Sequence, residues 1–208
     1  PFLDVPYKYK GKKYNLHDYF FVKSLDLVRE GGIVAFITST GTMDKMSTTL
    51  RSELSDKANL VAAYRLPSKA FANAGTDVVT DLIILQKRNE NAEKNGTDFI
   101  ASKEYILDDE ATGEYINEYF INNPQNVFGD IKLTSSYYGG NQLKVVNSSD
   151  IDTLFKTAIS KLPKDIMKPG NEIITVEKVD NSKPHFDVID GKTVLVNNGK
   201  AEVLTSNT

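Results

Sequence analysis

The amino-acid sequence predicts an α/β fold, and three observations lead to this prediction. Helical and strand-like patterns alternate along the first ninety residues, which is the order of a layered α/β sheet. The strand-like runs are short, continuous and apolar, as in strands that a parallel sheet buries on both faces. Apolar residues make up 40% and charged residues 25% of the 208 residues, which is enough apolar content for a globular core.

The first expected helix covers residues 16–30. Asn15 is a suitable N-cap, and Gly31-Gly32 should end the helix. The next run, IVAFI at 33–37, predicts a strand that is buried on both faces. The residues expected on the apolar face of the helix are Leu16, Phe20, Phe21, Leu25 and Val28.

A second helix is expected over residues 46–59, with Ser47 as its N-cap and with Leu50 and Leu54 facing inward. A second short buried strand follows at 59–67, where a proline closes it. These two elements continue the alternation of helix and strand.

A third strand is expected over residues 78–88, after a loop at 68–77. A crossover unit normally begins with a strand, but no strand pattern precedes the helix at residue 16. Residues 1–14 are therefore expected to form the loop that follows a missing strand. Because the chain begins with Pro1 and not with Met, we expect the cut to fall inside a domain.

The polar segment at 89–98 is either the first domain boundary or an insertion loop. We expect half of a core domain at 1–90, an appended mixed α/β region at 91–163 and a tail at 164–208. A further helix is expected within 111–129, from the helical spacing of Tyr115, Ile116, Tyr119 and Phe120, and Asn-Asn-Pro at 122–124 should end it.

A last helix is expected over residues 148–163, capped by Ser149 or Asp150 and stopped by a proline. A β-meander is expected within 185–204, where Asp-Gly and Asn-Gly pairs separate β-prone runs. Gly139-Gly140 predicts a turn. The apolar stripe of the last helix comprises Leu154, Phe155, Ala158, Ile159 and Leu162.

Composition excludes several kinds of protein. Without Cys, the chain has no disulfide, no thiolate metal site and no Cys nucleophile, and this weighs toward a reducing cytoplasm. No run approaches the ~18 apolar residues that span a bilayer. The formal net charge is −3, whereas many nucleic-acid-binding proteins are basic overall.

Lysine is nevertheless concentrated near the N-terminus. Lys8, Lys10, Lys12 and Lys13 lie within six residues, and such a group is either a solvated loop or a set of phosphate contacts. The solvated loop is the preferred interpretation, because charged runs are usually solvated.

Other candidate chemistry is sparse. The two histidines, His17 and His185, have no metal-ligand spacing and are interpreted as capping or packing residues. No GxGxxG, Walker A or GxSxG stretch occurs. The loops GTMD (41–44) and AGTD (74–77) follow strands, where α/β sheets bind ligands, but such loops are also ordinary connectors.

Several stretches in order resemble the C-terminal half of an N6-adenine DNA methyltransferase. They are Pro-Phe at the start, LHDYFFVKSLDLVREGGIVAFITSTGTMD and YRLPSKAFANAGTDVVTDLIILQKR. The resemblance is greatest to methylase domains of methylase–helicase proteins from plasmids, phages and conjugative elements, and more distant to modification subunits of type I restriction systems. It continues more weakly through YINEYFINNPQNVFG, YYG, LFKTAISKLP and HFDVIDGKTVLVNNGK.

The resemblance implies the second half of a Rossmann-like sheet, in which the last strand inserts antiparallel between its two neighbours, with an appended α+β region. It also implies that Pro1 and Phe2 end the catalytic tetrapeptide Asn-Pro-Pro-Phe, or its variant Asn-Val-Pro-Phe. Phe2 would then stack on a flipped-out adenine, with a contribution of ~1–3 kcal/mol. Without the resemblance, Phe2 is only a terminal hydrophobic residue.

The chain departs from the family pattern because it lacks the tetrapeptide's Asn and the upstream half with the glycine-rich turn that binds S-adenosylmethionine. The 208 residues alone are therefore expected to bind no cofactor and to be inactive, within a parent that methylates DNA. The four lysines would contact DNA phosphates. Gly75, Thr76 and Asp77 match the family's loop before the last strand pair, where we expect a turn.

Two alternatives stay open. The chain could be a non-catalytic DNA-binding or assembly module of a helicase-type or restriction-type protein, or an α/β domain whose likeness is coincidental. Expected partners are DNA and further domains of the same polypeptide, including a helicase. A sheet cut at its fourth strand would expose an apolar edge, through which the chain could self-associate.

Overall fold

The computed structural model describes residues 6–136, 139–147, 150–167, 184–189, 192–197 and 200–203. The chain divides into two compact units, Pro1–Lys168 and Pro169–Thr208. Pro1 and Phe2 lie outside the described residues, and so do the glycine turns expected in the C-terminal meander.

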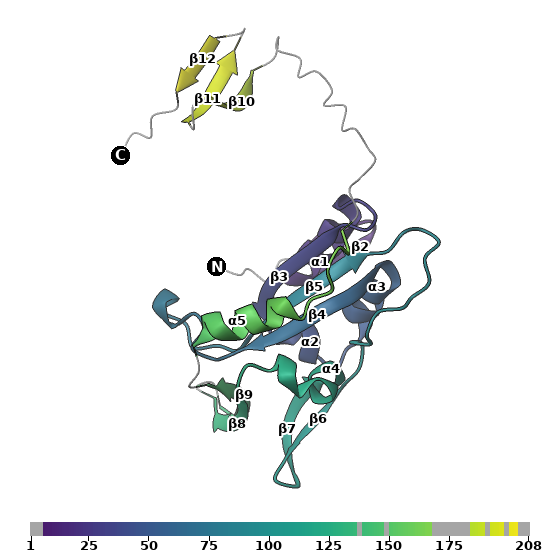
Figure 1. Ribbon diagram of the computed structural model, residues 1–208, viewed down its shortest axis with the longest axis vertical. Coiled ribbons are helices and arrows are strands. Elements are labelled where there is room, and N and C mark those ends of the chain that lie inside the picture. Colours follow the sequence, from purple (N-terminus) through teal and green to yellow (C-terminus); the bar gives the residue numbers. More distant parts are fainter. Residues whose placement is uncertain are drawn as a thin grey trace. The chain divides into compact units, whose positions relative to one another are not determined.

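A three-stranded sheet forms the centre of the first unit (Figure 1). Its strands are β3 (Ile33–Ser39), β4 (Ala58–Leu66) and β5 (Thr80–Lys87). β5 lies between the other two and is antiparallel to both, so β3 and β4 run in the same direction. The helices α2 (Gly41–Asp44) and α3 (Thr49–Lys57) connect them. This confirms the α/β prediction and the antiparallel insertion of the last strand; a complete Rossmann-like sheet stays a prediction.

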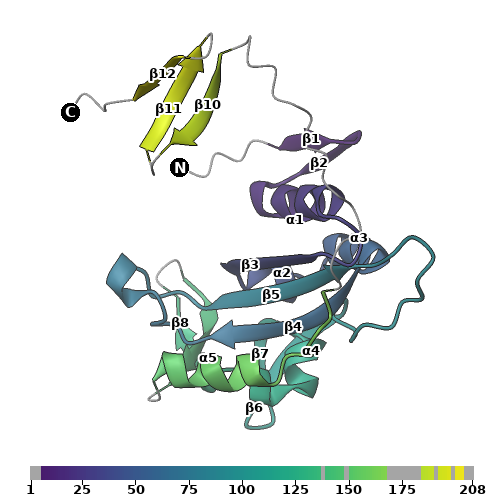
Figure 2. The same cartoon turned by 45° about the horizontal axis from the view of Figure 1, so that its top comes forward.

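Helices cover both faces of this sheet (Figure 2). α1 (Leu16–Leu27) and α3 pack on one face, and α5 (Ile151–Ser160) packs on the other. Successive β5 side chains alternate between the faces, as a strand requires. Ile83 belongs to the core beneath α1 and α3, whereas Ile84 packs in the cluster beneath α5.

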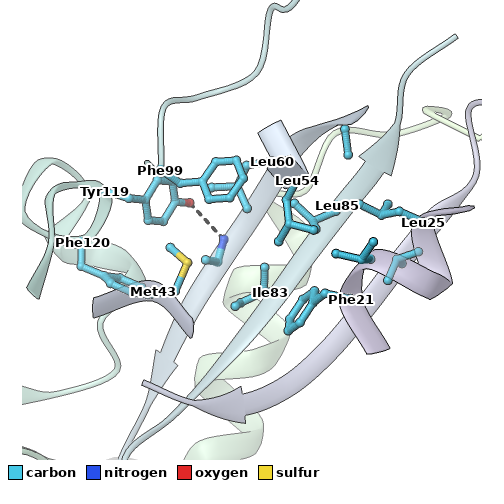
Figure 3. Close-up of a cluster of buried hydrophobic side chains, with 14 of the residues drawn as sticks. Phe21, Leu25, Met43, Leu54, Leu60, Ile83, Leu85, Phe99, Tyr119 and Phe120 are labelled. Atoms are coloured by element: carbon cyan, nitrogen blue, oxygen red, sulfur yellow. Dashed lines mark hydrogen bonds between the residues drawn. The ribbon is translucent and has the colours of Figure 1, made fainter. Parts of the chain in front are cut away.

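Residues beyond the polar segment at 89–98 complete the first core (Figure 3). Tyr119 and Phe120 of α4 (Glu118–Asn122) are buried beside β4, and the Ala63 amide donates to the Tyr119 hydroxyl at 3.1 Å. Burying a side chain of this size contributes about 1.5–3 kcal/mol. The regions before and after this segment therefore share one core, and the expected domain boundaries stay predictions.

The expected loop at residues 1–14 is instead a hairpin from residue 7 onward. β1 (Tyr7–Tyr9) pairs with β2 (Lys12–Tyr14) through a two-residue turn. Lys10 and Gly11 have positive φ angles of 48° and 79°, which is the backbone that tight hairpin turns need. The turn sequence is Lys-Gly, so the usual hairpin signals Asn-Gly and Asp-Gly do not identify it.

The helix expected within 111–129 is wrong over its first part, whereas its predicted end at Asn-Asn-Pro is confirmed. β7 (Glu110–Asn117) pairs with β6 (Ser102–Leu107), and only α4 is helical before a short 3₁₀ turn at Pro124–Asn126. Gly113 has a φ of 74°, which is incompatible with a helix interior. Asn117 ends the strand and caps α4 by accepting a hydrogen bond from the Tyr119 amide. The helical spacing of the aromatic residues arises where strand and helix meet.

The strand at 33–37 is buried on one face only. Val34 is buried, whereas Ile37 is 51% exposed. The cluster beneath α5 includes residues of β4 and β5 and none from the described part of β3. β3 also lies at the sheet edge, with β5 as its one strand neighbour in the described chain. An exposed apolar edge is thus present; self-association through it stays a prediction.

Three local expectations for helices were also wrong. Phe20 and Ile159 are 49% and 62% exposed. Each is the sequence neighbour of a buried residue, Phe21 or Ala158, and so lies beside the buried face of its helix and not on it. α1 ends at Leu27, where Val28 is the C-cap, before the two glycines. Ser47 does not cap α3, whose N-cap is Thr48 without a side-chain bond. The caps predicted at Asn15 and Asp150, and the inward Leu54, are confirmed.

The remaining strands form two small sheets. β8 (Asp130–Ser135) and β9 (Asn141–Val146) make a hairpin that the sequence did not predict, although the turn at Gly139-Gly140 is confirmed. In the second unit, β10 (His185–Ile189), β11 (Lys192–Asn197) and β12 (Lys200–Val203) form the expected meander.

Candidate functional site

The first candidate region is the β1–β2 hairpin, here called the lysine hairpin. Tyr7 and Tyr9 pack on Tyr19 of α1, with ring centroids 5.2 and 5.8 Å from its centroid. From β2, the Tyr14 hydroxyl donates to Glu53 of α3 at 2.9 Å. Burial, and then this hydrogen bond, raises the pKa of Tyr14 to about 12. The hairpin is therefore held on α1 and α3 by one of its faces.

Two of the four predicted phosphate contacts are used within the fold. The Lys10 ammonium lies 2.7 Å from Asp26 of α1, and Lys12 lies 3.2 Å from Glu53. Lys57 also pairs with Asp26, at 3.1 Å. Burial works to raise the pKa of Asp26, but the hydrogen bonds from Lys10 and Lys57 outweigh it and lower the pKa. Lys10 and Lys12 therefore position the hairpin.

The other two lysines lie on the face of the hairpin opposite to its tyrosines. Lys8 and Lys13 are opposite each other in the β1–β2 register, on the face that does not pack, and both are exposed. Neither forms a side-chain ion pair or hydrogen bond within the described part of the chain. Like charges directly opposite each other destabilise a hairpin. An anion that neutralises them would remove this repulsion.

The second candidate region is a cavity of about 510 Å³, here called the strand-end cavity. It lies where β3 and β4 end and β5 begins, and β7, β8 and β9 supply its opposite wall. Ligand sites in α/β proteins commonly lie at the carboxyl ends of strands, and cavities of this volume hold small molecules. Its polar lining includes Asp44, Lys45, Arg65, Asp77, Glu114 and Lys144.

A buried ion network forms the base of the strand-end cavity. Arg65 of β4 contacts Asp81 of β5 through two parallel hydrogen bonds of 2.9 Å, and both residues are fully buried. The Arg65 guanidinium also donates to Asp44 of α2 at 2.9 Å. Asp44 accepts a further hydrogen bond from the backbone N–H of Asn117. The Arg65 guanidinium also lies 4.3 Å from the Phe120 ring centroid. The network therefore joins the sheet to α2, β7 and α4.

The electrostatics of this network leave one carboxylate poised to titrate. Burial raises the pKa of Asp44 to about 6, and the negative charge of Asp81 adds to this against the opposing charge of Arg65. Burial also works to lower the pKa of Arg65, but the two carboxylates outweigh it and raise the pKa. One guanidinium thus faces two carboxylates. Such a site suits a ligand that donates hydrogen bonds, such as an amino group, more than a phosphate.

The AGTD loop reaches the wall of the strand-end cavity. Gly75 has a φ of 74° and closes a 3₁₀ turn at Ala72–Ala74, which confirms its role in a turn. Asp77 lines the cavity and pairs with Lys144 of β9 at 2.9 Å. Asp44 ends the GTMD loop, so the structure brings both Gly-Thr loops to one cavity. A smaller cavity of about 370 Å³ lies beside the lysine hairpin, and Lys45 lines both.

Sequence reasoning missed the network of Asp44, Arg65 and Asp81. The signal was present, because Arg65 and Asp81 interrupt apolar runs that were expected to be buried strands. A charge within a buried strand must be paired, so these two residues were candidates for an ion pair. Their register, with Arg65 opposite Asp81, follows only from the pairing of β4 with β5.

The described residues place limits on other chemistry. They contain no group of three or more His, Cys, Asp or Glu side chains arranged to hold a metal ion. No helix among them combines the length and the apolar character that crossing a membrane requires.

Comparison with known proteins relates both regions to one family. The model of the N-6 DNA methylase family matches residues 5–154, which include the lysine hairpin, the sheet and the strand-end cavity. The chain is 32% identical over 94 residues to "Defense against restriction protein B" of Escherichia phage P1. That match covers 44% of this chain and 4% of the phage protein, so the chain spans a small part of this relative's length. No solved structure matches the chain.

Proposed function

Because this chain belongs to the N-6 DNA methylase family, we propose that it forms part of an enzyme that methylates the N6 amino group of adenine in DNA. The observation that carries the proposal is the extent of the family match, which spans both candidate regions. The methyl donor of such an enzyme is S-adenosylmethionine. The name of the phage relative refers to defence against restriction, which is compatible with action on DNA.

The lysine hairpin supplies the DNA contact in this proposal. Lys8 and Lys13 contact phosphates, because they are exposed and have no carboxylate partner within the described residues. Lys10 and Lys12 position the hairpin through Asp26 and Glu53 and make weaker contributions to binding. This divides the four predicted contacts into two pairs with different roles.

The target base is read near the strand-end cavity in this proposal. An adenine amino group is a poor nucleophile, and oxygen atoms that accept its hydrogens raise the electron density on its nitrogen. Asp44 and Asp77 place such acceptors in the cavity lining. Pro1 and Phe2 end the catalytic tetrapeptide, with Phe2 stacking on a base flipped out of the duplex. The open edge of β3 receives the rest of the sheet.

The described residues do not fit the cradle expected for S-adenosylmethionine. No glycine-rich turn that opens a helix follows either of the two parallel strands, since β3 leads into Thr40-Gly41 and β4 into Pro67. We therefore place the donor site in another part of the methylase. The two candidate regions of this chain are assigned to the DNA and to the target base instead.

Calorimetry and product analysis test this proposal together. S-adenosylmethionine is titrated into the 208-residue chain and into a version extended by upstream residues, and each is then incubated with DNA. We expect donor binding and N6-methyladenine in the digested DNA only with the extended version. Donor binding by the 208-residue chain alone would show that the donor site is misplaced.

A second candidate is a non-catalytic DNA-binding module, and the exposed Lys8–Lys13 pair favours it. This alternative predicts DNA binding by the chain without methylation by the extended version. Absence of N6-methyladenine together with retained DNA binding would therefore replace the first proposal with the second.

A further inference from the structure

Three aromatic rings form a surface beside the lysine hairpin, here called the aromatic face. It comprises Tyr7 of β1 and Tyr19 and Phe20 of α1. The Tyr7 and Tyr19 rings are stacked, with centroids 5.2 Å apart, and Phe20 meets Tyr19 edge-on at 5.4 Å. The hairpin lies beside α1 and contacts it (Figure 2).

The aromatic face is left in water at a cost to the fold. Tyr7 and Phe20 are 39% and 49% exposed, and neither belongs to either core cluster of the described residues. Each ring that remains exposed forgoes part of the roughly 1.5–3 kcal/mol that full burial of such a side chain provides. Stacking on Tyr19 accounts for part of the Tyr7 ring, but the exposed parts of Tyr7 and Phe20 are not covered by either core cluster of the described residues.

Positive charge lies close to the aromatic face. The Lys23 ammonium lies 5.3 Å from the Tyr19 ring centroid and donates to the Tyr19 hydroxyl at 2.9 Å. Lys8 and Lys13 add two charges on the outer side of the hairpin. The nearby carboxylate of Asp26 is neutralised by Lys10 and Lys57. Exposed rings beside Lys23, with Lys8 and Lys13 on the opposite face of the same two-stranded hairpin, suit a polyanion that carries flat bases.

The geometry points to a binding site for single-stranded DNA on the aromatic face, with unpaired bases stacked on Tyr7 and Phe20 and phosphates near Lys8 and Lys23. Single-stranded DNA fits better than duplex DNA, because the bases of a duplex already cover each other and cannot stack on protein rings. The inference rests on the proposed function only in taking DNA as the polymer.

Fluorescence anisotropy with the 208-residue chain tests this site. The probes are a labelled oligothymidylate of about 12 nucleotides, within the usual site size, and a duplex of the same length. The variant Tyr7→Leu/Phe20→Leu keeps apolar side chains and removes both rings, and because Tyr7 also packs on Tyr19, unchanged amide-exchange protection of β1 and β2 is required to show that the hairpin stays on α1. We expect it to lose about tenfold or more in affinity for the single strand, as for other stacking platforms, with little change for the duplex.

Controls separate stacking from folding and from the proposed function. Ile106→Ala removes a comparably exposed apolar side chain from β6 and should leave binding unchanged. Lys8→Gln should reduce the dependence of binding on salt by about one phosphate contact. Equal affinity for both probes, or an unchanged affinity of the double Leu variant, would overturn the inference. Either result leaves the methylation assay of the extended version intact as the test of the proposed function.

Discussion

The strand-end cavity and the lysine hairpin are two polar regions built in opposite ways. In the cavity, Arg65 and Asp81 are fully buried and satisfy each other through two hydrogen bonds. In the hairpin, Lys8 and Lys13 face solvent without partners in the described chain. The buried region is fixed by the fold, whereas the exposed region leaves its charge unsatisfied. The residues that stabilise the fold most and the residues that are available to a ligand are therefore in different regions.

The two regions also respond differently to solution conditions. Charges in a low-dielectric interior are little affected by salt, whereas exposed lysines are screened. Burial raises the pKa of Asp44 to about 6, so the cavity responds to pH. Substitutions in the cavity should therefore change stability and its pH dependence, and those in the hairpin should change DNA binding and its salt dependence.

Arg65→Met should destabilise the chain most. It leaves Asp81 buried without its cation, and loss of one partner of a buried pair costs about 3–5 kcal/mol. Urea unfolding followed by circular dichroism measures the change. Lys144→Met is the matched control, because its pair with Asp77 is partly exposed and should contribute about 0–1 kcal/mol. Equal losses in the two variants would contradict the difference between buried and exposed pairs.

Asp44→Asn should change how stability depends on pH. The folded pKa of about 6 lies above the ordinary 3.8, so between these values the folded state holds a proton that the unfolded state has released. Asp44 therefore lowers stability as pH rises from about 4 to 7, by up to about 3 kcal/mol at 1.36 kcal/mol per pKa unit. The stability of the Asn variant relative to the natural chain should rise over this range.

Asp26→Asn in α1, which removes the partner of Lys10 in the lysine hairpin, provides a control in which stability changes with pH in the opposite direction. The pKa of Asp26 is lowered, so its contribution to stability is present at neutral pH and is lost as pH falls through the lowered value. This variant should be less stable than the natural chain at neutral pH and approach it in acid. Urea midpoints measured from pH 3 to pH 8 compare the two variants, and slopes of the same sign would contradict the assignment.

The same contrast explains how much the sequence could predict. Local patterns located β4, β5, α1, α3 and α5, because apolar periodicity and the caps at Asn15 and Asp150 act within a few residues. The antiparallel place of β5 came from the family resemblance. The strand β7 was missed because its pairing with β6 overrides a helical spacing.

Contacts between distant segments limited the prediction of the site. The lysine cluster was visible, but only the pairing of Lys8 with Lys13 and of Lys10 with Asp26 shows which lysines are free. Similarly, Asp44 reaches Arg65 and the Asn117 amide across 21 and 73 residues. No local pattern specifies contacts at such separations.

Tyr14→Phe should loosen the lysine hairpin without affecting the cavity. It removes the hydroxyl that donates to Glu53, and a hydrogen bond to a charged group contributes about 1.5 kcal/mol. Amide hydrogen exchange should become faster in β1 and β2, while β5 keeps its protection. Unchanged exchange in the hairpin would show that the ring packing on Tyr19 and the ion pairs of Lys10 and Lys12 are sufficient to hold it.

Lys13→Glu should have the smallest effect on stability. It should raise stability slightly and lower the affinity for DNA. It turns the Lys8–Lys13 repulsion into an attractive cross-strand pair, which should stabilise the chain by about 0.2–1 kcal/mol. DNA affinity should fall, and its salt dependence should weaken by about two charges, because one cation is lost and another is neutralised. Lys12→Glu is the control, since it disrupts the pair with Glu53 and should reduce stability. A gain in stability with unchanged DNA affinity would assign the unpaired lysines no binding role, whereas the paired gain and loss would show that this hairpin retains repulsion in order to bind an anion.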